Sequence, residues 1–309
     1  MSLFVAVIAL IIEQFRPLAA ARWVDAPLAG LAEFLESRLN DGQYRQGVIA
    51  WCLAVALPAA VVQGIYLALL WLQPFLALLF GIAVLYVTMG FRQFSHFFTD
   101  IHLALRMGEL DHARALLGQW RGSVADRLSS NEIARLSIEQ ALVASHRHVY
   151  APLACFALIG PGGALLYRLA AFFAACWSMR SDPATLAVGR FSEFSRHAFA
   201  IIDWLPVRLS AAGFAVVGDF EDAVFCWRTQ ASGWPDASAG ILIASGAGAI
   251  GVRLGQPVRE GLDLGDRPEL GLGEEADADY MQSTIGLVWR TLLLGLMVLA
   301  LVWVSSWVG

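Results

Sequence analysis

Lysine is absent from this sequence, since all 21 basic side chains are arginine. The absence of lysine excludes a phosphate-binding P-loop, whose lysine reaches the nucleotide phosphates, and it excludes Schiff-base catalysis through lysine. Charged residues of both signs are scarce, at 15% of the chain, whereas soluble proteins contain about 25%. The net charge of −5 lacks the basic excess of nucleic-acid-binding proteins, so we expect no nucleic-acid partner.

Cysteine is also rare, and the four cysteines form no C-x-x-C pair. Three of them lie in or beside apolar runs, which is typical of buried, reduced thiols. His146 and His148 fall on different helical faces with no third ligand nearby, so we predict no metal site. The N-terminus lacks a basic segment and a small-residue cleavage site. We therefore expect residues 1–12 to be a retained short span or an interfacial helix, not a secretory signal.

A long charge-free stretch, from Gln46 to Phe91, dominates what is present. It is apolar on every helical face, whereas a soluble helix keeps one polar face. Crossing a bilayer core of about 30 Å takes roughly 20 helical residues, so the stretch is long enough for two crossings. Because proline ends a helix, Leu72-Gln73-Pro74 is the predicted turn of a membrane hairpin.

Further apolar stretches predict more spans, at 151–179, 198–218 and 291–308. Polar stretches between them favour amphipathic helices outside the bilayer, and Ser129 with Glu132 offers a helix N-terminal cap. The predicted helix at 104–120 belongs to this polar part. The predicted fold is all-α, a polytopic integral membrane protein with cytoplasmic amphipathic helices. We expect five parts: an N-terminal apolar helix with an amphipathic segment (1–45), the hairpin (46–91), a cytoplasmic helical region (92–148), a core with two spans, a Gly-rich helix and an acidic loop (149–284), and a final span (285–309).

The run from Ile241 to Gly251 contains G-x-G-x-x-G and imitates a dinucleotide fingerprint. That fingerprint needs a helix after the glycines, which Gly255, Pro257 and Gly261 would break. Spacing of small residues every four positions instead favours a tightly packed helix.

Three ionisable residues, Arg168, Asp203 and Arg208, lie in apolar surroundings. Such residues are costly in a membrane and usually face a bundle interior or pair with one another. We expect Pro206 to break the helix between Asp203 and Arg208 and to allow them to meet. A structural ion pair and a polar pocket at the membrane surface both remain open.

Several motifs resemble the CobD/CbiB family of cobalamin-biosynthesis membrane proteins and its AmpE branch. The resemblance covers most of the chain and rests on the segments 106–114, 149–152, 161–168, 202–209, 233–235 and 251–255. It implies an inner-membrane, multi-pass bacterial protein with one of two functions. AmpE-like members are proposed signalling modulators, and CbiB-like members are adenosylcobinamide-phosphate synthases, which form an amide between adenosylcobyric acid and aminopropanol phosphate.

Departures from the synthase pattern favour the AmpE-like interpretation with a degenerate site. Glu139 keeps the first acid of one synthase motif, but Val143, Ala144 and Arg147 replace later polar positions. Apolar residues also replace N-T-L-D at 171–174. An active synthase is the alternative. A third option is a transporter or scaffold, with Arg168 and Asp203 as an intramembrane pair.

Either function would use the same candidate residues. The resemblance implies possible catalytic roles for Glu139, Asp203 and Asp236, and ligand binding by Tyr167, Arg168, Arg208, Trp234 and Arg253. It implies ATP and Mg²⁺ as cofactors only if the chain is a synthase. The expected partners are the lipid bilayer and a corrinoid or cell-wall-derived small ligand, and the sequence also allows a homo-oligomer.

Overall fold

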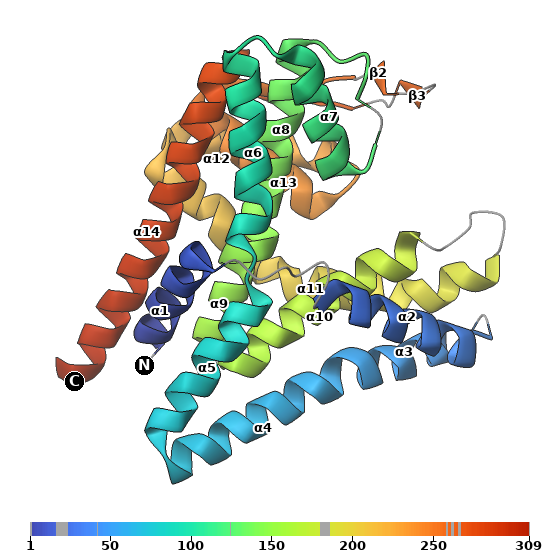
Figure 1. The fold of residues 1–309 in the computed structure, drawn as a ribbon, viewed down its shortest axis with the longest axis vertical. Helices are drawn as coiled ribbons and strands as arrows, with labels where there is room; N and C mark the ends of the chain where they lie inside the picture. Colours follow the sequence, from blue (N-terminus) through green and yellow to red (C-terminus); the bar gives the residue numbers. More distant parts are fainter. Residues whose placement is uncertain are drawn as a thin grey trace. The chain divides into compact units, whose positions relative to one another are not determined.

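The computed structural model describes residues 2–16, 24–41, 43–123, 125–179, 186–257, 259–260, 263–264 and 267–308. Helices dominate this part of the chain (Figure 1). Four helical segments are long and apolar enough to cross a membrane: Tyr44–Leu72, Ser130–Ile159, Arg190–Val217 and Ala278–Ser305. The prediction of an all-α polytopic membrane protein is therefore confirmed.

The chain forms two compact units. The first comprises Met1–Gly90, Arg147–Pro206 and Leu299–Gly309, and the second comprises Phe91–His146 and Val207–Val298. Each unit combines segments that are distant in sequence, and the long helices α11 (Leu186–Val217) and α14 (Ala278–Val308) contribute to both.

The first unit is a bundle of apolar helices. Its further elements are α1 (Ser2–Phe15), α2 (Ala26–Leu39), α3 (Tyr44–Trp51), η2 (Cys52–Ala56), α4 (Leu57–Leu72), α5 (Pro74–Thr88), α9 (Ala151–Ile159) and α10 (Pro161–Met179). The π-helical turn η2 joins α3 to α4, and α4 and α5 form a hairpin that turns at Gln73, as Pro74 predicted (Figure 1). The α10 helix packs against α9, α4 and α5.

The second unit packs shorter helices around a small sheet. Its helices are α6 (Phe91–Arg106), α7 (Leu110–Arg121), α8 (Ser130–Ser145), α12 (Phe220–Thr229), η4 (Ala231–Gly233) and α13 (Ala237–Ile250). The π-helix η3 (His146–Tyr150) follows α8 directly. Small residues let α13 approach α12 closely, since a Cβ on Gly248 would overlap the backbone of Asp222 and Ala223. The predicted packed helix at this position is confirmed, and it precedes a strand, which is the reverse of the dinucleotide-binding order.

Short strands follow α13, and the sequence analysis did not predict them. In the three-stranded sheet, β1 (Val252–Gly255) lies between β4 (Glu269–Gly271), which is antiparallel to it, and β5 (Glu274–Glu275), which is parallel. The register pairs Arg253 with Gly271 on one side and with Glu275 on the other. A separate antiparallel pair is formed by β2 (Arg259–Glu260) and β3 (Asp263–Leu264).

Three predicted helix boundaries are wrong. The helix expected over 104–120 is interrupted, because α6 ends at Arg106 and Gly108 adopts a left-handed conformation before α7. The expected span at 151–179 is divided at Gly160, where Pro161 begins α10. Pro206 does not break α11, which runs through it. Apolar bundles accommodate a proline because neighbouring groups satisfy the freed backbone carbonyl.

Candidate functional site

A polar cavity of about 200 Å³ lies in the second unit. It forms where the N-terminus of α8 meets β1 and the end of β5. Two arginines and two glutamates contribute its charges, and the lining residues are Ser129, Asn131, Glu132, Arg135, Arg253, Gln256, Glu275 and Ala276. Both signs of charge in one small space are typical of a site for a polar ligand, because a purely structural core would be apolar.

The start of α8 is fixed by the capping box that its sequence predicted. The Ser129 side chain accepts a hydrogen bond from the backbone N–H of Glu132, and the Glu132 carboxylate accepts one from the backbone N–H of Ser129 at 2.8 Å. This reciprocal pair satisfies two otherwise free donors of the helix end. It holds Arg135, one turn further along α8, at the cavity wall.

Arg135 is 8% exposed and donates from Nη1 to Oε1 of Gln256 at 2.7 Å. Gln256 follows β1 with a φ of 65°, and Gly255 before it has a φ of 76°. A Cβ on Gly255 would collide with the carbonyl of Pro268, so this turn requires glycine. The turn fixes the Gln256 amide that meets Arg135.

Glu139 lies one turn beyond Arg135 on α8 and is buried, with 6% of its surface exposed. Its Oε1 accepts the backbone N–H of Gly255 at 2.9 Å, and its Oε2 accepts a short charge-assisted hydrogen bond from Nη2 of Arg267. The guanidinium of Arg267 also stacks over the ring of Trp234, 4.8 Å from its centroid. Glu139 is therefore a fixed anchor between α8 and the loop around the sheet.

Several guanidinium donors at this site are unused. The buried Nε atoms of Arg135 and Arg253 and the Nη1 atom of Arg267 have no hydrogen-bond partner among the described residues. An unpaired buried donor costs about 1–3 kcal/mol. Such groups in a native protein call for an explanation, and an absent ligand is one.

In the first unit, other predicted residues form two closed contacts, meaning direct contacts with other side chains of the protein. Tyr167 is fully buried and donates to the Asp203 carboxylate at 3.0 Å. Arg168 pairs with Asp25 at 2.9 Å and contacts Nδ1 of His148 at 3.0 Å. The expected alternative pairing of Arg168 with Asp203 is thus replaced by a pairing with Asp25.

The remaining predicted residues have different places. Asp236 caps the N-terminus of α13, where its carboxylate accepts the backbone N–H groups of Ser238 and Ala239 at 3.0 and 3.3 Å. Asp236 therefore has a structural role as a helix cap. Arg208 lies half-buried on α11 in the second unit.

The two buried cysteines offer no activated nucleophile. Cys155 and Cys226 are buried free thiols as predicted, whereas Cys52 is exposed, contrary to the prediction of burial. Burial, and then the nearby carboxylate of Asp222, raise the pKa of Cys226 to about 11. A thiol with so high a pKa stays protonated at neutral pH and is a poor nucleophile.

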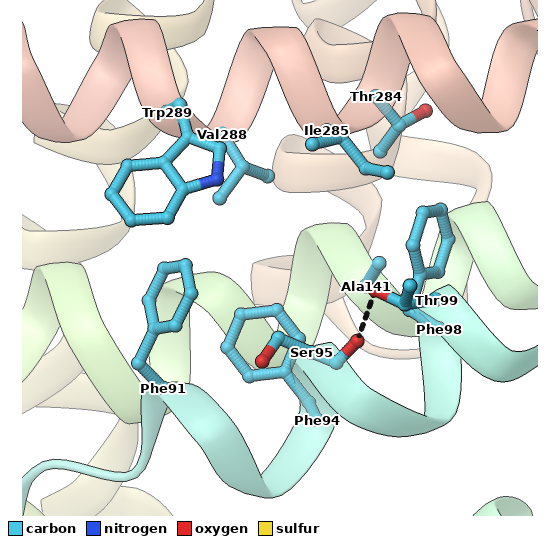
Figure 2. A pocket seen from close by; sticks show the side chains of 10 residues that line it. All are labelled: Phe91, Phe94, Ser95, Phe98, Thr99, Ala141, Thr284, Ile285, Val288 and Trp289. Atoms are coloured by element: carbon cyan, nitrogen blue, oxygen red, sulfur yellow. Dashed lines mark hydrogen bonds between the residues drawn. The ribbon is translucent and has the colours of Figure 1, made fainter. Parts of the chain in front are cut away.

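A second cavity in the same unit is apolar and holds only about 60 Å³ (Figure 2). Phe91, Phe94 and Phe98 of α6 face Trp289 of α14 across it. The Thr99 hydroxyl at its edge donates to the backbone carbonyl of Ser95 at 2.8 Å. Apart from the hydroxyl residues Ser95, Thr99 and Thr284, its lining is apolar, and it contains no titratable side chain.

The predicted residues are therefore only partly brought together. Glu139, Trp234 and Arg253 belong to the polar cavity or its immediate support, whereas Tyr167, Arg168 and Asp203 belong to the first unit. Sequence reasoning missed Arg135 and Arg267. A signal for Arg135 existed, because it lies one turn before Glu139 on a helix whose N-terminus was predicted.

Helical spans define a polytopic membrane protein, and its polar cavity, lined by arginine and glutamate, is a candidate site. The family model described as CobD/Cbib protein matches residues 10–288. This match covers most of the sequence, and the chain belongs to the CobD/CbiB family.

Named relatives agree with this assignment. The chain is similar to "Cobalamin biosynthesis protein CobD" of Stutzerimonas stutzeri (strain A1501), at 34% identity over 87% of each chain. It is also similar to a protein of the same name from Chromobacterium violaceum, at 32% identity over 70% of this chain and 68% of the relative. "Cobalamin biosynthesis protein CbiB" of Salmonella arizonae is 22% identical over 84% of this chain and 83% of its own length. No solved structure matches. These names fit the synthase alternative better than the AmpE-like interpretation that the sequence analysis favoured.

Proposed function

We propose that this protein is a multi-pass inner-membrane enzyme of bacterial cobalamin biosynthesis that forms an amide bond between adenosylcobyric acid and aminopropanol phosphate. The observation that carries the proposal is the polar cavity of the second unit, where Arg135 and Arg253 have unused buried donors. A regulatory remnant would have little reason to keep such donors in a buried place. The names of the relatives point to the same pathway.

The proposed reaction places clear demands on the protein. The amine nitrogen of one substrate attacks the carboxyl carbon of the other, and a carboxyl oxygen must leave. Arginine side chains suit the phosphate group of the amine substrate, because their planar forks match phosphate oxygens. Glu275 lines the same cavity and carries the charge that an ammonium group would meet.

ATP, when bound, would supply the phosphoryl group that converts the leaving carboxyl oxygen into phosphate. Among the described residues no cluster of three or more His, Cys, Asp or Glu side chains is suited to hold a metal ion. The cavity instead presents two carboxylates, Glu132 and Glu275. Magnesium is commonly held by one or two carboxylates together with substrate phosphates, so these two residues fit an ion that accompanies a nucleotide.

Complementation tests the proposal. The chain is expressed in a bacterium that lacks its own synthase, cobyric acid is supplied, and cobalamin-dependent growth is scored. We expect growth with the wild-type chain and with Arg228→Gln, which changes an exposed arginine of α12 in the same unit. We expect no growth with Arg253→Gln, although that protein reaches the membrane.

Lack of growth with abundant wild-type protein in the membrane would contradict the proposal. Purified protein that consumed no ATP with a corrinoid and aminopropanol phosphate would contradict it as well. Both results together would favour the non-catalytic, AmpE-like function. The replacement of polar positions, for example by Val143 and Ala144, supports that function.

A further inference from the structure

The polar cavity contains two guanidinium groups that form no direct ion pair with a described residue and keep unused hydrogen-bond donors. Neither Arg135 nor Arg253 forms an ion pair with another described residue, and both line the cavity. Arg135 is buried, with only 8% of its surface exposed. The carboxylates of Glu139, Glu132 and Glu275 act on Arg135 without a direct ion pair, but burial still disfavours its charged form, because it removes the water that would solvate the guanidinium. An anionic ligand in the cavity would remove this penalty.

Arg267 acts on the cavity without lining it. Its charge opposes the charged form of Arg135, whereas the charges of Glu139, Glu132 and Glu275 favour it. Glu139 holds one side of the Arg267 guanidinium, and the Trp234 ring covers its face. The pair of Glu139 and Arg267 is therefore rigid. It also fixes Gly255, from which the chain continues to Gln256, the partner of Arg135.

We propose that Arg135 and Arg253 bind the phosphate group of a small phosphate monoester, and that Glu139 and Arg267 position these two arginines without touching the ligand. The ligand's identity as the amine substrate rests on the proposed function, whereas the phosphate site itself does not. Glu139 is thus a positioning residue, which differs from the catalytic role that the sequence analysis considered.

Charge favours a phosphate over a carboxylate in this site. A phosphate monoester has a charge of about −1.5 to −2 and three strong acceptor oxygens. It therefore offers acceptors for the unused donors of both arginines, whereas a carboxylate has a single charge and two oxygens. Arginine binds such groups through parallel charge-assisted hydrogen bonds.

Size favours a small ester over a large ligand. A volume of about 200 Å³ equals the share of only about seven waters in the liquid, at roughly 30 Å³ each. Sites for drug-sized ligands hold about 300–1,000 Å³. A corrinoid is excluded from this cavity by size, so a second substrate of that kind needs another surface.

Binding to the purified full-length chain in detergent tests the proposal. Titration calorimetry is performed with ethanolamine phosphate, inorganic phosphate, ATP, and ethanolamine as the probe without phosphate. We expect ethanolamine phosphate to bind and ethanolamine not to bind. We expect Arg135→Gln and Arg253→Gln each to weaken binding of ethanolamine phosphate about tenfold or more, and Arg228→Gln to leave it unchanged.

Each outcome decides the question. Unchanged affinity for phosphate probes in both cavity variants, or no binding of any phosphate probe to the wild type, overturns the proposal. Binding of ATP alone, weakened in both variants, would overturn the assignment to a small monoester, because it would place a nucleotide phosphate at the two arginines. Binding with the expected pattern but without amide synthesis supports the site and contradicts the proposed function, so the two failures are distinguishable.

A second measurement does not depend on the folding of variants. Wild-type protein is treated with an arginine-specific dicarbonyl reagent with and without ethanolamine phosphate, and the modified peptides are identified by mass spectrometry. We expect the ligand to protect Arg253 and not Arg228. Equal modification of Arg253 with and without ligand would overturn the proposal. Glu139→Asp should raise the Kd for ethanolamine phosphate, and Arg253→Gln should still raise the Kd further in that variant. A purely structural role of Glu139 would not predict this pattern.

Discussion

The two units of this protein use buried arginine in opposite ways. In the first unit, Arg168 is neutralised by Asp25 at 2.9 Å and contacts His148 at 3.0 Å. In the second unit, Arg135 and Arg253 form no ion pair with a described residue. A buried Nε atom without a partner among the described residues is common to all three arginines, so the difference lies in the ion pair alone. On our proposal, the contrast separates an arginine that stabilises the fold from two arginines that bind a ligand.

The same contrast applies to the acids. Asp203 in the first unit accepts a hydrogen bond from the neutral Tyr167 hydroxyl, which leaves the carboxylate within a closed contact. Glu139 in the second unit binds a cation and a backbone amide that both belong to the cavity's supporting loop. A buried acid is therefore not by itself evidence of catalysis. Its partners decide whether it supports a site or only a helix contact.

The largest effect is expected from Glu139→Gln, which keeps the shape of the side chain and removes its charge. Arg267 would then be a partly buried cation without its carboxylate, since only 19% of its side chain is exposed. Removing one partner of a buried ion pair typically costs about 3–5 kcal/mol. We expect a lower midpoint of thermal unfolding, measured by tryptophan fluorescence in detergent, together with weaker binding of ethanolamine phosphate.

Asp279→Asn is the matched control for this variant. Asp279 pairs with Arg106 in the same unit, but the two side chains are 78% and 52% exposed, and exposed pairs contribute only about 0–1 kcal/mol. Equal losses of stability in Glu139→Gln and Asp279→Asn would show that the Glu139 pair is not a special support of the cavity.

An intermediate effect is expected from Tyr167→Phe in the first unit. The substitution removes the donor that Asp203 uses at 3.0 Å and leaves a buried carboxylate short of one hydrogen bond. Such a loss costs about 1–3 kcal/mol. We expect reduced thermal stability with unchanged affinity for ethanolamine phosphate, because Tyr167 belongs to the closed contacts.

Tyr44→Phe, at a tyrosine that is 43% exposed in the same unit, should change stability by no more than about 0.5 kcal/mol. Loss of ethanolamine phosphate binding in Tyr167→Phe without a loss of stability would contradict the comparison of the two units, because it would make a residue of the first unit's closed contacts a ligand-binding residue.

Local signals made part of this fold predictable. Pro74 marks the hairpin turn, Ser129 and Glu132 mark the start of α8, and the small residues of α13 mark a packed helix; each of these signals acts within a few residues. Pro206 misled the prediction, because packing in an apolar bundle overrides the local tendency of proline to end a helix. The strands have two to four residues each, which is too short for an alternating pattern.

The site was less predictable than the fold, because long-range contacts build it. Arg253 was identified from its motif, but Arg135 meets its partner Gln256 across 121 positions of sequence. Arg267 meets Glu139 across 128 positions. No local pattern in the sequence reports such contacts. Motif resemblance placed Tyr167, Asp203 and Arg253 in one candidate site. In the structure Tyr167 and Asp203 belong to the first unit and Arg253 to the second, which the motifs do not show.

The smallest effect is expected from His102, a half-buried histidine on α6 of the second unit. Burial, and then the neighbouring charge of Arg106, hold the pKa of His102 below its usual value of 6.5. As the pH falls through 6.5, the unfolded chain gains a proton that the folded protein resists, so stability is lost until the lower pKa of the folded state is reached. His102→Gln should therefore flatten the decline of the unfolding midpoint between about pH 7 and pH 5. His112→Gln, at an exposed histidine of α7, should leave the decline as it is in the wild type. A steeper decline in His102→Gln would mean that protonated His102 stabilises the fold, and that the charge of Asp279, which favours protonation, outweighs burial and the charge of Arg106.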